Sequence, residues 1–184
     1  KEKLANQFKR IVSTYTNGKI STKVFYVLKV TDECFHNFIV GQCIEAVILG
    51  ALCTIGMLIL RLPYAVMIGV FVGCTALIPI AGAYIGAIVG VIMIFTVAPV
   101  KSIFFIVFII ILQQLENQLI YPKVVGSSIG LPGIWVFASV MIGGGLFGIQ
   151  GVIFGIPIVS VFYQLIKNDL NKREKNNILK KVQV

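Results

Sequence analysis

Charged side chains are scarce through the middle of this sequence. Only five occur between residues 34 and 166, and the stretches between them consist mainly of Ile, Val, Leu, Phe, Ala and Gly. The five are Glu45, Arg61, Lys101, Glu116 and Lys123. With 58% hydrophobic and 12% charged residues, the chain lacks the polar side chains that cover a soluble globular protein. This absence excludes a soluble fold and indicates a protein of the lipid bilayer.

Residues that commonly carry catalysis or metal binding are also lacking. His36 is the single histidine, which excludes a histidine-based zinc site or proton relay within these residues. The four cysteines form no Cys-x-x-Cys pair, and they are interpreted as small buried hydrophobic residues. Nucleotide-binding loops, nucleophile elbows and metal motifs do not occur. We therefore expect no enzyme activity, no metal and no cofactor.

The net charge of +9 lies at the two ends of the chain. Seven Lys and Arg residues precede the first apolar run, and six follow the last. This pattern is typical of topology signals and of attraction to anionic lipid, with a protein or nucleotide partner as the alternative, and nucleic acid is not expected. Because Lys and Arg next to membrane segments favour the cytoplasmic side, both ends are predicted to be cytoplasmic.

Four apolar runs account for most of the sequence, and two of them are much longer than the roughly 20 residues that one helical crossing needs. The runs cover residues 37–60, 64–98, 102–120 and 133–166. If both long runs are hairpins, the chain crosses six times, and an even number agrees with two cytoplasmic ends. The sequence therefore predicts an all-α, polytopic transmembrane bundle of about six apolar segments, some of them broken by Pro and Gly.

Three regions are expected along the chain. Residues 1–36 form a cytoplasmic or interfacial segment, residues 37–167 the transmembrane domain, and residues 168–184 a basic cytoplasmic tail. Within the first region, residues 4–30 carry apolar side chains near one helical face and basic ones on others, which predicts an interfacial amphipathic helix. Thr31 and Asp32 are expected to cap the first membrane helix, which stops near Pro63.

Proline and glycine interrupt both long runs. Pro79 removes a backbone donor, and Gly82 and Gly86 lower helix propensity, so a break near Pro79 is predicted. GxxxG spacings there favour tight helix packing, with a backbone substrate site as the alternative. Five glycines crowd residues 143–151, among them Gly144, Gly148 and Gly151, and they favour a tight external turn over a hinge. A kink is expected at Pro157.

A polar cluster at the end of the third apolar run is the strongest chemical signal. Gln113, Glu116 and Asn117 lie on an arc of one helix that is too polar to face lipid, which favours a cavity. Alternatively, the cluster lies at the cytoplasmic membrane surface, where Glu116 pairs with Lys123 or solvent. Glu45 is expected near the same side of its own span, so the two carboxylates are candidates to exchange protons or cations.

A weak internal repeat adds Gln42 to the candidate residues. The segments 42–45 (QCIE) and 113–116 (QQLE) each precede a broken run by about twenty residues. If each repeat holds three crossings, the second copy is inverted, which is a common transporter plan with the site at the interface between the copies. Generic membrane composition produces such matches as well. The predicted transport pathway is therefore Glu116, Gln113, Asn117, Glu45 and Gln42.

Three stretches in a fixed order resemble the autoinducer-2 exporter family: LRLPYAVMIGVFVGCTALIPIAGAYIG, QQLENQLIYPKVVGSSIGLPGIWVF and GGGLFGIQGVIFGIPIVSVFYQLI. The likeness spans about residues 30–170. The matching positions are Pro63, Pro79, Gly82, Gly86, Gln113, Glu116, Pro122, Lys123, Gly126, Gly130, Pro132, Gly144, Gly148, Gly151 and Pro157. The motifs are not an established catalytic set.

The resemblance implies a multi-pass protein of the bacterial inner membrane whose chain is near twice this length, with N-terminal spans that are missing here. It also implies export of a furanone signal, or exchange of sodium or lithium for protons. We expect a secondary transporter for a small hydrophilic solute, with proton or sodium coupling, lipid as its surroundings and a homo-oligomeric assembly. A passive channel and a membrane scaffold are the alternatives from other classes.

Overall fold

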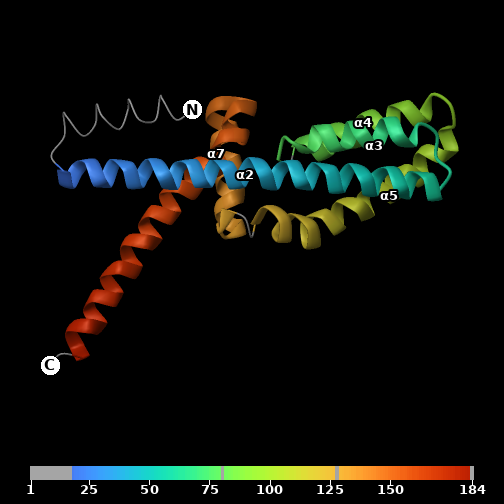
Figure 1. Ribbon diagram of the computed structural model, residues 1–184. Coiled ribbons are helices and arrows are strands. Elements are labelled where there is room, and N and C mark those ends of the chain that lie inside the picture. The colour runs from blue at the N-terminus through green and yellow to red at the C-terminus, as the bar shows by residue number, and fades with distance from the viewer. Residues whose placement is uncertain (1–17, 80, 127–128, 183–184) are drawn as a thin grey trace, which may run out of the picture. The chain divides into compact units, whose positions relative to one another are not determined.

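The computed structural model describes residues 18–79, 81–126 and 129–182. No strand occurs among these residues, so the predicted all-α class is confirmed. The elements in chain order are α2 (Gly18–Ile59), α3 (Ala65–Ala76), α4 (Ala81–Phe95), α5 (Pro99–Leu115), the π-helical turns η1 (Glu116–Ile120) and η2 (Pro122–Gly126), and α7 (Gly133–Val182) (Figure 1). Most of the amphipathic helix predicted for residues 4–30 lies outside the described residues.

The chain divides into two compact units. Unit 1 comprises residues 1–34 and 161–184, and unit 2 comprises residues 35–160. In unit 1, Nδ2 of Asn168 on α7 donates a 2.7 Å hydrogen bond to the phenol oxygen of Tyr26 on α2. The ammonium of Lys172 lies 4.9 Å from the centre of the same ring, a favourable cation–π distance. These contacts join the first part of α2 to the last part of α7.

Helix α2 runs without interruption from Gly18 to Ile59, so the helix start predicted at Thr31 and Asp32 is wrong. The Thr31 hydroxyl instead donates to the Val27 carbonyl at 2.9 Å, a bond back to the preceding turn that leaves the helix intact. The boundaries predicted at residues 36/37 and 167/168 fall inside α2 and α7, and they stay predictions.

The C-terminus of α2 lies where the sequence predicts it, just before Pro63. Arg61 takes the left-handed conformation with φ of 51°. The Leu62 N–H donates to the Met57 carbonyl at 2.9 Å, and the Arg61 N–H donates to the Leu58 carbonyl at 3.1 Å. This pair of bonds is the Schellman ending of a helix. The Lys101 ammonium donates to the Arg61 carbonyl at 2.9 Å, which ties the turn to the start of α5.

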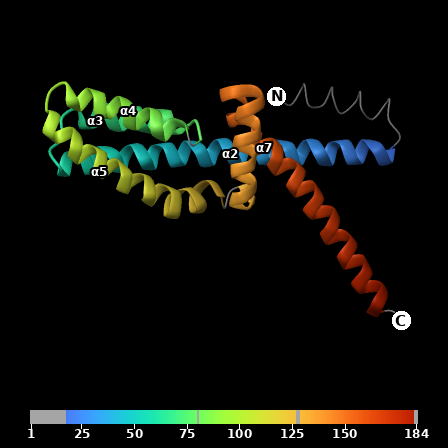
Figure 2. The same cartoon turned by 180° about the vertical axis from the view of Figure 1, so that it is seen from behind.

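By length and composition, three of the described helical stretches suffice to cross a bilayer: Thr22–Ile59, Pro99–Gly126 and Gly133–Lys172, the last of which is interrupted at Gly148. Helices α3 and α4 have 12 and 15 residues. At about 1.5 Å per residue they rise only about 18 and 22 Å, short of a hydrocarbon core of about 30 Å. The prediction of six full crossings is therefore wrong for these two helices, which form a short hairpin with Pro79 in its turn (Figures 1 and 2).

Glycine lets the helices of unit 2 approach at backbone distance. A Cβ added at Gly73 on α3 would lie 2.8 Å from the carbonyl oxygen of Ala46 and 3.2 Å from the Cα of Gly50, both on α2. One added at Gly82 on α4 would collide with the carbonyl oxygen of Thr75 on α3. Such close contacts are how helices associate in lipid, where apolar burial provides no driving force.

Helix α7 folds back on itself at Gly148. The backbone there has φ of 62° and ψ of −142°, which is outside the helical range. A Cβ added at Gly143 would collide with the carbonyl oxygen of Gly151, so the two arms of this hairpin touch at their glycines. Pro157 lies buried in the second arm, and the helix continues through it. Gly148 therefore sets the direction of the second arm.

Gly148→Ala is expected to destabilise the protein by about 1–3 kcal/mol, because a Cβ strains the backbone at positive φ. The control is Gly145→Ala in the same helix, since an added Cβ meets nothing within 4 Å at either position. The control should be neutral or stabilising by up to about 1 kcal/mol. Thermal unfolding in detergent micelles measures both, and equal melting temperatures for the two variants would contradict the strain argument.

Candidate functional site

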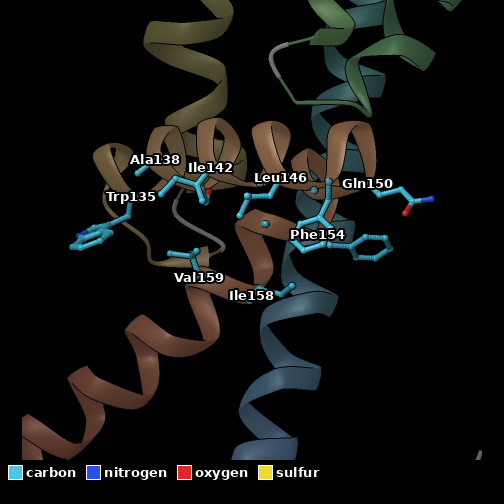
Figure 3. Close-up of a pocket in the computed structure, with 13 residues that line it drawn as sticks. Trp135, Ala138, Ile142, Leu146, Gln150, Phe154, Ile158 and Val159 are labelled. Atoms are coloured by element: carbon cyan, nitrogen blue, oxygen red, sulfur yellow. The ribbon is translucent and has the colours of Figure 1, made fainter.

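One cavity of unit 2 is almost wholly apolar. It has a volume of about 440 Å³ and lies between the two arms of α7. Figure 3 shows apolar side chains from both arms around it, including Ile142, Leu146 and Ile158. Ser139 and Gln150 are the polar side chains among the residues that line it. A surface of this kind suits lipid tails or another helix, and it offers little to bind a polar solute.

The second cavity, about 510 Å³, has the chemistry of a polar binding site. Its walls come from α2, the α3–α4 hairpin, α5 with η1, and the first arm of α7. None of the residues that line it is Lys, Arg or His. Its polar side chains are those of Gln42, Glu45, Tyr84, Gln113, Gln114, Glu116, Asn117 and Tyr121. The cavity is therefore rich in hydrogen-bonding oxygen and amide groups and carries no cationic side chain.

Two buried carboxyl groups face each other in this cavity. Glu45 is 1% exposed and Glu116 is 8% exposed, and their side chains lie within hydrogen-bonding reach of one another. A carboxylate is an acceptor only, so two carboxyl groups hydrogen-bond only when at least one of them holds a proton. Glu45 on α2 and Glu116 on η1 are therefore close enough for one proton to be shared between them.

Gln42 fixes one half of this pair. Its Nε2 donates to Oε2 of Glu45 at 2.5 Å and to the carbonyl oxygen of Ala76 at 2.9 Å. Ala76 is the last residue of α3, so its carbonyl is one of the groups that have no partner within their own helix. The amide of Gln42 therefore links the acid pair to the open end of a short helix.

Three buried polar atoms of the cavity have no hydrogen-bond partner among the described residues of the chain. They are Oε1 of Gln42, Nε2 of Gln113 and Oε2 of Glu116. Leaving such a group unpaired costs about 1–3 kcal/mol, so sites of this kind hold water or a bound polar molecule. The two acceptors and one donor mark where a small solute would contact the walls.

The structure brings together all five residues predicted for the transport pathway, because Gln42, Glu45, Gln113, Glu116 and Asn117 all line the second cavity. Glu116 is buried, and the alternative that places the cluster at the cytoplasmic membrane surface, with Glu116 paired to Lys123 or solvent, stays a prediction. Pro79 also lines the cavity. The other predicted break residues do not: Gly82 and Gly86 pack against α3, while Gly144, Gly148, Gly151 and Pro157 belong to the α7 hairpin.

The family-motif residues that follow the site in sequence lie in η2 and in the segment before α7. Pro122, Lys123 and Gly126 form part of η2, and Gly130 and Pro132 precede α7, with Gly130 at φ of 64°. Sequence reasoning left out three polar side chains of the cavity, those of Tyr84, Gln114 and Tyr121, and the Ala76 carbonyl. The Ala76 carbonyl is a backbone group with no sequence signal, whereas Tyr121 has one, a phenol at the polar end of an apolar run directly before proline.

Apolar helices of membrane-spanning length around a cavity with buried acids define a multi-pass helical membrane protein with the features of a transporter. The family model described as "AI-2E family transporter" matches residues 1–171. The chain belongs to this family, which confirms the resemblance in the sequence.

Similar proteins carry transport names. "Putative transport protein YueF" of Bacillus subtilis (strain 168) is 31% identical over 140 residues, which cover 76% of this chain and 38% of YueF. "Putative permease PerM" of Escherichia coli (strain K12) is 29% identical over 168 residues, which cover 90% of this chain and 46% of PerM. The chain thus spans less than half the length of these relatives. No solved structure matches it.

Gln42→Leu is expected to destabilise the protein by about 1–3 kcal/mol, because Glu45 and the Ala76 carbonyl each lose a buried donor. Gln118→Leu is the control, since Gln118 is exposed and its hydrogen bond to Gln114 is long, at 3.4 Å. Thermal unfolding in micelles compares the two. Equal melting temperatures would show that the Gln42 bonds do not support the fold.

Proposed function

We propose that this protein is a secondary carrier that moves a small hydrophilic solute or signal across the bacterial inner membrane, with the second cavity as its transport site. The observation that carries the proposal is the Glu45–Glu116 pair, two acids buried in helices of membrane-spanning length. Ionisable groups at such depth are costly, and they usually serve a substrate or proton pathway. The membrane and transport names of the relatives agree with this role.

The surroundings of the pair favour a carrier over a scaffold. A scaffold would pack its helices with satisfied polar groups, whereas this cavity leaves three buried polar atoms without a protein partner. The end of α3 meets the cavity through the Ala76 carbonyl, and broken helices contribute such groups to the sites of known transporter folds. A volume of about 510 Å³ is large enough for a small organic solute.

Exchange of sodium or lithium for protons is the second candidate, and the shared-proton pair favours it. When the pair releases its proton, two negative charges lie among oxygen atoms, and Lys, Arg and His are absent from the lining residues. Hard cations prefer such oxygen ligands. The same lining disfavours an organic anion, which would find no positive partner there. The basic ends support a cytoplasmic location for both termini.

Glu116→Gln is expected to abolish transport in proteoliposomes while insertion and thermal stability are retained, because a carboxamide keeps the shape and hydrogen bonds but cannot release a proton. The full-length protein is reconstituted with a pH-sensitive dye inside. Sodium, lithium, neutral polyols and organic ammonium ions are then offered outside as a panel.

Glu33→Gln is the matched control, since Glu33 is an exposed glutamate on α2, the helix of Glu45, and pairs with Lys29 at 3.7 Å. It should transport like the wild type. A carrier saturates and responds to a pH or sodium gradient, whereas flux that does not saturate would indicate a channel. If Glu116→Gln transports as fast as Glu33→Gln, the role of the pair is refuted.

A further inference from the structure

The backbone conformation of the π-helical turn η1 explains why Tyr121 lies beside the acid pair. The Tyr121 N–H donates to the Glu116 carbonyl five residues back, the bond of a π-helix. In an α-helix, five residues turn through about 500°, so the two side chains would point about 140° apart. The i→i+5 bond instead places Tyr121 one turn above Glu116, on the same face.

Pro122 explains why the helix widens at this point. An α-helix would require the nitrogen of Pro122 to donate to the Gln118 carbonyl, and its ring would press against that same carbonyl. Proline has no N–H to donate, so the regular ladder of α-helical bonds ends, and the π-helical turn η1 ends at Ile120, two residues before Pro122. A proline outside the cavity thereby determines which side chain enters it.

The phenol of Tyr121 lines the cavity and lies near enough to both Glu45 and Glu116 to interact with their charge. The other titratable side chain among the lining residues is Tyr84 of α4. The residues that α3 and the first arm of α7 contribute to the lining are not titratable. Three acidic or phenolic groups from α2 and the η1 turn thus meet in one place.

We propose that Tyr121 is the third member of the acid site, that its phenol donates a hydrogen bond to the Glu45–Glu116 pair when the pair releases its proton, and that Pro122 positions it through η1. The released proton passes to water in the cavity, and the phenol keeps its own. This role rests on the proposed function and specifies what stabilises the doubly ionised pair.

The direct test is infrared spectroscopy of the full-length protein in liposomes, where the carbonyl stretch of a protonated carboxyl group disappears as the pair ionises. Tyr121→Phe removes the phenol donor, so the midpoint of this change should move to higher pH by about one unit. Tyr64→Phe is the matched control, an exposed tyrosine that does not line the cavity, and it should titrate like the wild type. An unmoved midpoint in Tyr121→Phe, or an equal shift in Tyr64→Phe, overturns the proposal.

Pro122→Ala tests the positioning step. The restored N–H permits the α-helical bond to Gln118, which turns Tyr121 away, so the midpoint should move in the same direction as in Tyr121→Phe. The double variant should then match Tyr121→Phe alone, because the phenol is the only group through which Pro122 acts. Additive shifts would refute the positioning role.

Failure of the transport proposal is separable from failure of this inference. If Glu116→Gln transports normally but Tyr121→Phe still moves the infrared midpoint, the acid site exists without a transport role. If Glu116→Gln blocks transport and Tyr121→Phe leaves the infrared midpoint in place, the carrier proposal stands and Tyr121 is not part of its proton chemistry.

Discussion

The close approach of helix backbones at glycine is the contact on which unit 2 depends. In lipid, apolar side chains gain nothing by leaving one hydrocarbon surface for another, so helices associate through dispersion contacts and polar bonds. Gly73 brings α3 against Ala46 and Gly50 of α2, and Ala46 directly follows Glu45. The same contact places the end of α3 where the Gln42 amide reaches the Ala76 carbonyl. The polar cavity is a consequence of this packing, since larger residues at these positions would separate the helices that form its walls.

Much of the fold class could be predicted from the sequence, because hydrophobic length and charge placement report directly on the bilayer. The residues of the cavity could be predicted too, since Glu116 and Glu45 are the only acids of the apolar region. Their proximity could not, as the two lie 71 residues apart, and no local pattern encodes a contact between distant helices. The internal repeat paired the segments around these two residues, although resemblance between segments does not establish contact between them.

Errors arose where local signals competed with tertiary structure. Thr31 and Asp32 have the chemistry of a helix cap, but inside a long helix the Thr31 hydroxyl bonds to the preceding turn instead. The run of residues 64–98 is long enough for two short helices and a turn, and its length alone did not reveal that neither helix reaches across the hydrocarbon. The π-helical turn could not be predicted from the sequence. Its one sequence feature is a proline, and a proline in a helix usually indicates a kink.

The shortness of α3 and α4 has a consequence for their backbone hydrogen bonds. The last carbonyls and the first amides of an α-helix have no partners within that helix, and at membrane depth such groups are not left against lipid tails. The turn satisfies several of them, because the N–H groups of Leu77 and Ile78 donate to the carbonyls of Cys74 and Thr75, and those of Ala81 and Gly82 donate to the carbonyls of Pro79 and Ile78. The Ala76 carbonyl is satisfied by the side chain of Gln42 instead. The amide that holds Glu45 therefore also closes the end of a helix, so the hairpin and the acid pair depend on one side chain.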